Sequence, residues 1–238
     1  MDYALYIAGA IVFFPALVLM YRIFKGYTYP AVEDPFFKDS TLFTIFAVGL
    51  IEGFVISAFY VKMDMSNMLI GILFSVIQTL LVLVVLNLKR FHRKSDTVFY
   101  GFSLGMGQGV GMAFGISASL LSVFEDLGDV DTYTWAIVVV ITAMELLLMS
   151  SVGAAVGEGV ARLQLAEYTL QGMMVCTLAM IMWTFAVMGV DSWYWIPMSL
   201  IALAVSAYYF YKKIHLGLSS IVSEVLRIEG NKRKDVPR

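Results

Sequence analysis

The chain has 238 residues, of which 60% are hydrophobic and 14% are charged, and its mean hydropathy is +0.83. This composition excludes a soluble domain, because a soluble domain needs a largely polar surface. The net charge of −2 indicates no nucleic-acid partner. We expect a multi-pass protein of the cell membrane whose first partner is the lipid bilayer.

Seven apolar runs are long enough to cross a bilayer as helices, since a hydrocarbon core of about 30 Å takes roughly 20 apolar residues. In chain order they cover 3–21, 41–61, 67–88, 97–122, 134–157, 169–190 and 193–211. The predicted fold class is all-α, a polytopic bundle of seven transmembrane helices. Residues 1–213 form the transmembrane domain in this prediction, and residues 214–238 form a cytoplasmic amphipathic helix and basic tail.

Basic residues orient the predicted bundle. Because the spans alternate in direction, one side of the membrane receives Arg22, Lys25, Lys38, Lys89, Arg90, Arg93, Lys94, Arg162, Lys212, Lys213, Arg227, Lys232, Arg233, Lys234 and Arg238. The other side receives only Lys62 and the acidic connector at 125–131. The positive-inside rule therefore places the amino terminus outside and the carboxyl terminus inside.

Residues beyond Lys213 show an amphipathic helical pattern. The apolar positions that recur at helical spacing are Ile214, Leu218, Ile221, Val222 and Val225. Such a helix either lies on the inner membrane surface, where the basic tail binds anionic lipid, or extends the last span and packs on the bundle. The sequence leaves both possibilities open.

Four polar side chains fall at one depth in four predicted helices. Glu52, Gln78, Gln108 and Glu145 each lie 11 positions after the predicted helix starts at 41, 67, 97 and 134, which is roughly 16 Å into the membrane. An ionised carboxylate at mid-bilayer costs about 2.5–3.5 kcal/mol, so such residues need a reason to be there. Either protonated acids bond to the glutamines between helices, or a wet site uses the acids to share a proton, bind a cation or activate water.

Small residues indicate which helix faces pack closely. Gly49 and Gly53 flank Glu52, and the face of Glu145 continues through Gly153 and Gly157. The helix at 97–122 carries two glycine stripes about half a turn apart, one of Gly101, Gly105 and Gly109 and one of Gly107, Gly111 and Gly115. Since small residues at intervals of four mark close helix contacts, we expect this helix to be central and contacted on both sides.

Three other features have more ordinary readings. Glu158, at the inner end of the fifth span, can pair with Arg162 or extend to the interface, and we favour extension to the interface. Cys176 is expected to be a small core residue. No Cys and His set for zinc exists, so we predict neither a metal site nor a cofactor.

The fourth and fifth predicted helices resemble a known family. The stretch at 100–108, continuing to Gly115, is similar to the glycine-rich helix of PrsW-type glutamic intramembrane proteases, relatives of the CAAX proteases. The stretch from Glu145 to Gly153 resembles the motif that follows it, and Glu52 falls where the family carries paired glutamates. The resemblance implies an intramembrane peptidase fold.

The departures from that family fall on its catalytic positions. Aligned on the glycines, Met112 replaces an acid, Glu145 replaces a histidine, and a later histidine would fall near Met180. The two histidines of the chain, His92 and His215, lie in predicted inner connectors. The resemblance therefore implies a degenerate centre whose surviving acids are Glu52 and Glu145. A related seven-span subunit of gamma-secretase, the anterior-pharynx-defective subunit, is a precedent for a scaffold.

Three functions follow as hypotheses. The chain is a catalytically silent scaffold that binds a membrane partner through its glycine faces, an active intramembrane peptidase that uses Glu52 and Glu145, or a proton or cation carrier that uses the same polar layer. Missing histidines count against the peptidase, and the lack of a recognisable inverted repeat counts against the carrier. We favour the scaffold. A microbial rhodopsin is excluded, because the span at 193–211 has no lysine for a Schiff base.

Overall fold

The computed structural model describes residues 2–63, 66–124, 127–189, 193–231, 233 and 235–237. Over these residues the protein is all-helical, without a strand. The α-helices are α1 (Asp2–Phe24), α2 (Asp39–Tyr60), α3 (Met68–Leu86), α4 (Asp96–Leu121), α5 (Thr132–Arg162), α6 (Leu165–Met188), α7 (Trp195–Phe210) and α8 (Leu218–Glu229). Two 3₁₀ turns, η1 (Lys89–Phe91) and η2 (Leu127–Asp129), and one π-helical turn, η3 (Tyr211–Leu216), complete the order.

Helices α1 to α6 are long and apolar enough to cross a membrane. The seventh predicted span differs, because α7 has only 16 residues, or about 24 Å at 1.5 Å per residue. The chain continues without a break into η3, which adds six residues in π-helical geometry. The seventh run is therefore helical, but a crossing of full length has to include this π-helical turn with Lys212 and Lys213.

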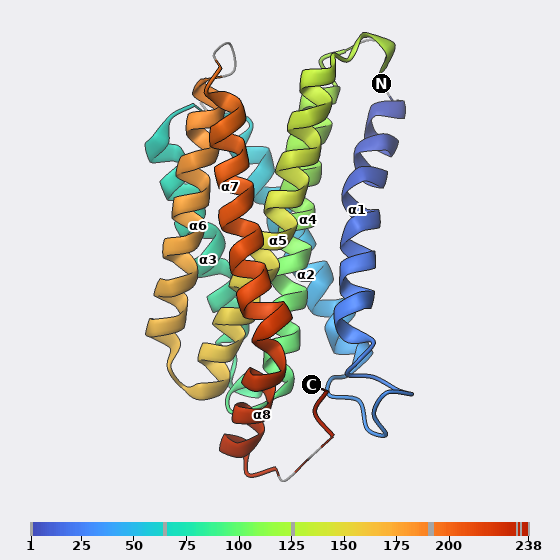
Figure 1. Ribbon diagram of the computed structural model, residues 1–238, viewed down its shortest axis with the longest axis vertical. Coiled ribbons are helices and arrows are strands. Elements are labelled where there is room, and N and C mark those ends of the chain that lie inside the picture. The colour runs from blue at the N-terminus through green and yellow to red at the C-terminus, as the bar shows by residue number, and fades with distance from the viewer. Residues whose placement is uncertain are drawn as a thin grey trace.

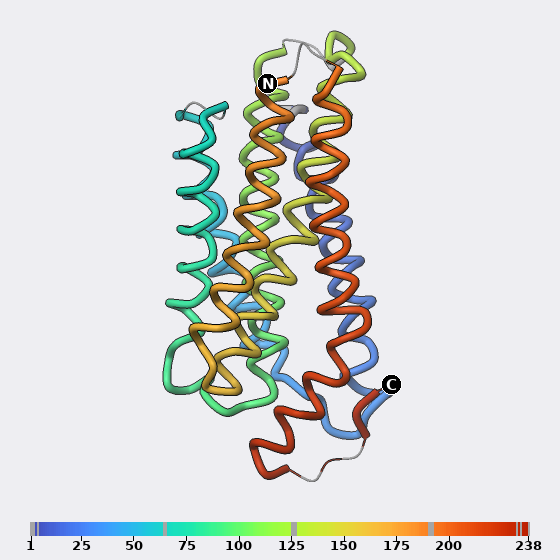
Figure 2. The backbone as a smooth tube through the Cα atoms, turned by 60° about the vertical axis from the view of Figure 1, so that its left-hand side comes forward, coloured from blue at the N-terminus to red at the C-terminus, as the bar shows by residue number. Residues whose placement is uncertain are grey.

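Helix α4 lies at the centre of the bundle (Figure 1), and its residues 97–113 are all buried. Helices α2 and α5 make the most extensive contacts with it, while α1 packs on it more lightly. Helices α3, α6 and α7 surround the rest of α5, as the turned view in Figure 2 shows. The core thus has three helices, α2, α4 and α5, in a row.

Local sequence signals fix several helix ends. The Asn67 side chain accepts a hydrogen bond from the Leu69 amide at the start of α3, and Asp131 accepts one from the Thr134 amide at the start of α5. These are ordinary amino-terminal caps. Gly230, with φ of 79°, ends α8 in the left-handed conformation that glycine adopts without strain.

The two ends of the bundle differ in charge. The connectors that follow α1, α3 and α5 lie at one end together with α8, and the amino terminus lies at the other (Figure 1). We call the first the basic end, because every described Lys and Arg except Lys62 lies in its connectors or in the helix termini beside them. The tail residues Lys232, Lys234 and Arg238, and Glu125 and Asp126 of the acidic connector, lie outside the described residues.

Helix α8 covers part of the basic end of the bundle (Figure 1). Its apolar face, formed by Leu218, Ile221, Val222, Val225 and Leu226, is buried in the same core as the spans. Of the two arrangements that the sequence left open, the structure has the helix packed on the bundle.

Candidate functional site

The two glycine stripes of α4 face two different helices. Gly101, Gly105 and Gly109 lie against backbone atoms of α5, including the carbonyls of Gly153, Met149 and Glu145. A Cβ atom added at Gly109 would lie 2.6 Å from the Glu145 carbonyl oxygen. At these three positions a side chain larger than hydrogen therefore has no room between α4 and α5.

The second stripe faces α2. Gly107 and Gly111 lie against the carbonyls of Phe46 and Leu50, and Gly115 lies against the Ser57 side chain. On α2, Gly49 and Gly53 lie against the α4 carbonyls of Leu104 and Gln108. On α5, Gly153 and Gly157 lie against the α4 carbonyls of Gly101 and Thr97. Both glycine faces are used within the chain. This corrects the expectation that a membrane partner binds through them.

Three members of the predicted polar layer come together on one side of α4. The Gln108 side-chain amide of α4 donates a hydrogen bond of 3.3 Å to the backbone carbonyl of Gln78 on α3. The Cys176 thiol of α6 donates to the Gln78 side-chain oxygen at 3.7 Å. Glu145 of α5 lies within electrostatic range of Cys176. We call Gln78, Gln108, Glu145 and Cys176 the central polar cluster.

Glu52, the fourth member, lies apart from this cluster. Its neighbour Gly53 contacts the Gln108 carbonyl, so Glu52 is at the same depth, but α2 and α5 pack on opposite faces of α4. The Glu52 side chain is half-buried, whereas Glu145 is fully buried. The two acids share a level in the bundle, but neither acts electrostatically on the other, so the structure lends no support to the expectation that they act as a pair.

The central polar cluster has more polar atoms than hydrogen bonds. Both carboxylate oxygens of Glu145, the Gln108 side-chain oxygen and the Gln78 side-chain nitrogen are buried and have no partner among the described residues. The Tyr60 hydroxyl, which lies within electrostatic range of Glu145, is a fifth such atom. Because the great majority of buried polar groups are bonded to protein or to ordered water, the atoms of this cluster are available to bond to water or to bind a proton.

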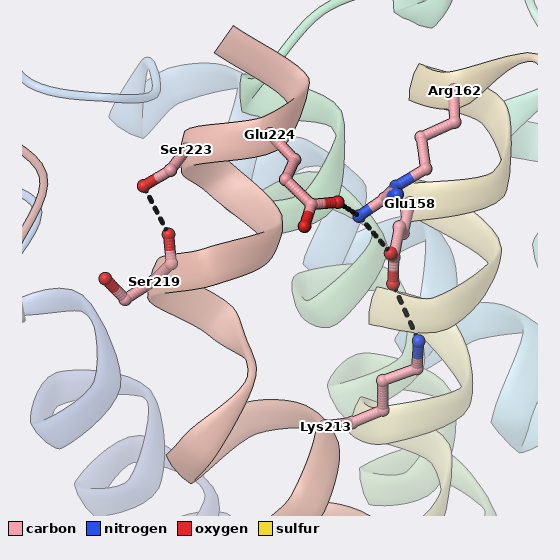
Figure 3. Close-up of polar contacts among 6 residues, drawn as sticks. All are labelled: Glu158, Arg162, Lys213, Ser219, Ser223 and Glu224. Atoms are coloured by element: carbon pink, nitrogen blue, oxygen red, sulfur yellow. Dashed lines mark hydrogen bonds and ion pairs between the residues drawn. The ribbon is translucent and has the colours of Figure 1, made fainter. Parts of the chain in front are cut away.

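A second polar cluster lies on α5 closer to the basic end (Figure 3). Glu158 is 2% exposed. Its carboxylate oxygens lie 2.7 Å from the Lys213 ammonium nitrogen and 2.8 Å from an Arg162 guanidinium nitrogen. The same Arg162 nitrogen lies 2.5 Å from a carboxylate oxygen of Glu224 on α8. We call Glu158, Arg162, Lys213 and Glu224 the basic-end ion cluster. It joins α5, η3 and α8.

Glu158 does not extend to the interface, so that expectation was wrong. Its carboxylate forms ion pairs with Arg162 and Lys213, and these pairs compensate for the free-energy cost of removing the charge from water. Lys213 was assigned to a connector from the sequence and was missed as a partner. The π-helical turn η3, which contains Lys213, changes the helical phase after α7, and π-helical turns are frequent at functional sites. The spacing of Glu158 and Arg162 was the only sequence signal for this cluster.

Aromatic rings support the two cations. The Tyr168 ring of α6 lies 4.8 Å from the Lys213 ammonium and 5.7 Å from the Arg162 guanidinium, within cation–π range. The Tyr209 hydroxyl of α7 is buried without a described partner and lies within electrostatic range of Glu158. Segments α5, α6, α7 and η3 therefore converge around this carboxylate, and α8 joins them through the pair of Glu224 with Arg162.

Within the described ranges, no group of three or more His, Cys, Asp and Glu side chains could hold a metal ion. Met63 lies in the connector between α2 and α3, Met68 is the first residue of α3, and Met65 lies outside the described residues.

Over the described residues the architecture defines an all-helical protein with six helices suited to a membrane and with polar clusters at two levels of α5. No family model, no curated protein and no solved structure matches the chain.

Proposed function

We propose that this chain is a multi-pass membrane protein that serves as a binding or scaffold subunit for a membrane partner. The single observation that carries the proposal is the row of α2, α4 and α5. Backbone contacts at the glycines hold these helices together, with Glu145 buried on α5 and Glu52 half-buried on α2, which packs on the opposite face of α4. A rigid core with its two acids on opposite faces suits support of a partner better than chemistry that needs both acids on one water molecule.

The proposal includes the seven-span topology, with the amino terminus outside and the carboxyl terminus inside. The segregation of basic residues at one end supports this orientation. Cys176 is fully buried, so single cysteines introduced at Gly128 and Asn231 can be labelled against a low background. A membrane-impermeant thiol reagent should label Gly128→Cys from outside the cell and Asn231→Cys only after lysis. Labelling of Asn231→Cys in intact cells would contradict this orientation and favour the opposite one.

A groove between α1 and α5 is the surface we assign to the partner. It has a volume of about 420 Å³ and is lined by Ala10, Ile11, Phe14, Pro15, Leu19, Val139, Thr142, Ala143, Leu146 and Leu147. Ala10 and Ala143 permit close approach of another helix, and the Thr142 hydroxyl is buried without a described partner. Small residues and a free hydroxyl are what one membrane helix offers to another.

Co-purification from native membranes in mild detergent tests this role. Ala143→Phe fills the groove and should reduce recovery of the partner at least tenfold, whereas Ala47→Phe, on an exposed position of α2, should retain it. Changing both Glu52 and Glu145 to Gln should leave recovery unchanged. Equal recovery in the two Phe variants would contradict the assigned groove, and a chain that always elutes alone would contradict the scaffold.

The family resemblance to PrsW-type proteases remains part of the proposal, with Glu52 and Glu145 as the surviving acids of a degenerate centre. Cleavage of a membrane peptide by the purified chain in liposomes, lost in Glu52→Gln, would instead establish the peptidase. Ion uptake into liposomes that depends on pH and on Glu145 would establish the carrier.

A further inference from the structure

A line of polar side chains runs along the interface of α3 and α6, which lie side by side in Figures 1 and 2. On α3 it consists of Ser75, Gln78 and Thr79, and on α6 of Cys176, Thr177 and Thr184. We call this set the α3–α6 polar seam. All of these side chains except that of Thr177 are buried.

Hydrogen bonds join two pairs of side chains across the seam, Ser75 with Thr177 and Gln78 with Cys176. The hydroxyls of Ser75 and Thr177 lie 2.7 Å apart across the interface, and the Thr79 hydroxyl donates to the Ser75 carbonyl at 3.0 Å. Cys176 donates to the Gln78 side chain, which places that end of the seam in the central polar cluster. Serine, threonine and glutamine side chains both donate and accept hydrogen bonds, so water molecules that bridge the unlinked members would complete a path for a proton.

The seam has a direction. Thr184 lies about one turn from the end of α6, against Gly71 near the start of α3, where the bundle approaches its amino-terminal end. The Thr184 hydroxyl is buried with no described partner, so it can bond to an entering water molecule. Beyond Thr79, toward the basic end, the buried residues of α3 are Val82 and Leu86. The polar route therefore leads from the amino-terminal end to the centre and no further along α3.

At the inner end of this route is Glu145, whose carboxylate has no partner for either oxygen. The cations of α5 and η3, Arg162 and Lys213, are committed to Glu158. The titratable groups that act on Glu145 from the packed helices are Tyr60 of α2 and Cys176 of α6, and neither supplies positive charge. An isolated charge in the bilayer interior is costly, so a bound proton is the simplest way to make this residue neutral.

We propose that Glu145 is a proton-binding site that exchanges its proton with the solution at the amino-terminal end of the bundle through the α3–α6 polar seam. In the exchange a hydronium ion gives its proton to the carboxylate, which leaves a carboxylic acid and a water molecule, and the reverse step releases the proton. Only O–H bonds form and break. The bound acid donates a hydrogen bond to an oxygen acceptor of the cluster, such as the unpartnered Gln108 side-chain oxygen. This role is independent of the partner groove between α1 and α5.

Infrared spectroscopy of the full chain in lipid bilayers tests the site. The carbonyl stretch of a protonated carboxylic acid should be present at neutral pH, disappear in Glu145→Gln and persist in Glu52→Gln. A band unchanged in Glu145→Gln would overturn the proposal, as would the lack of a protonated-acid band in the wild-type chain.

Exchange into deuterated buffer tests the route. Deuteration of the Glu145 carboxylic acid shifts the same band, and the rate of the shift is set by how fast deuterons from the solution reach Glu145. The double variant Thr177→Val and Thr184→Val keeps side-chain volume but removes two hydroxyls of the seam, and it should slow the shift at least tenfold. Thr169→Val, the same change on α6 about two turns from the seam toward the basic end, should leave the rate unchanged. A wild-type rate in the double variant would overturn the route. These threonine variants keep Glu145, so the test stands even where Glu145→Gln fails to fold.

Discussion

Glu145 and Glu158 lie on one helix, thirteen residues apart, and their surroundings differ in charge. Glu158 is buried but meets Arg162 and Lys213, with Glu224 beyond. Glu145 is buried within electrostatic range of the Cys176 thiol and the Tyr60 hydroxyl, and no described cation pairs with it. The comparison teaches that burial of a carboxylate does not define its role, because the neighbours decide whether the charge is paired or has to be removed.

The largest expected effect comes from opening the helix row that encloses Glu145. A Cβ atom at Gly105 would overlap the Met149 carbonyl of α5, so Gly105→Val should prevent α4 and α5 from packing and yield aggregated protein. Gly128→Ala, where an added Cβ meets no atom within 4 Å, serves as the control and should behave as the wild type. Size-exclusion profiles in detergent distinguish them, and a monodisperse, thermally stable Gly105→Val would refute the enclosed core.

The direct test of the comparison is the same substitution at both acids. Glu158→Gln leaves Arg162 and Lys213 without their buried partner, and removing one member of a buried ion pair costs about 3–5 kcal/mol. Glu145→Gln removes no ion pair, so the expected change is that of one neutral hydrogen bond, about 1 kcal/mol. Thermal unfolding in detergent measures both variants. Similar losses at the two positions would mean that the environments do not differ as described.

A smaller effect is expected at the outer edge of the basic-end ion cluster. The Glu224 side chain is 49% exposed, and exposed ion pairs contribute roughly 0.2–1 kcal/mol. Glu224→Gln should therefore leave the bundle intact and increase hydrogen exchange in α8 alone, with the effect reduced at high salt. Ser223→Ala, at a neighbour whose hydroxyl donates to the Ser219 carbonyl, is the matched control. Increased exchange in α5 as well would show that α8 supports the buried pair.

The smallest effect concerns the far end of α5, where Asp131 caps the helix in water. Hydrogen bonds from Thr134 lower the pKa of Asp131 from its ordinary value of 3.8. A lowered folded-state pKa means that the cap stabilises the helix fully above that ordinary value, and that its contribution is lost as the pH falls through the folded-state pKa.

Hydrogen exchange of the first turn of α5 reports this cap. Asp131→Ala should exchange faster than the wild type at neutral pH, and the two should converge in acid. Asp131→Asn, a cap that does not titrate, should protect the turn at both pH values. A difference between Asp131→Ala and the wild type that persists in strong acid would contradict capping by the carboxylate.

Periodicity and glycine spacing predicted much of the architecture. Apolar runs of about 20 residues have one stable form in a bilayer, the helix, because no water is present to satisfy a free backbone. The stripe through Gly105 and the stripe through Gly111 pointed to two faces, and in the structure α5 lies against the first and α2 against the second. Such contacts are readable because only glycine permits backbones to approach this closely.

Pairing of side chains was not readable in the same way. Equal depth suggested that Glu52 and Glu145 meet, but α4 lies between their helices, and depth along a helix says nothing of the direction around it. Glu158 and Lys213 are 55 positions apart in the sequence. Their contact depends on a π-helical turn that the residue pattern did not predict.

The sequence by itself determined that this protein is helical, suited to a membrane, charged differently at its two ends and built around a glycine-rich helix, because these properties follow from hydropathy and from the size of single residues. Only the tertiary structure decided which carboxylate is paired, which is left alone, and where α8 lies. Those outcomes depend on how helices are rotated and stacked against one another, and a one-dimensional pattern does not contain that rotation.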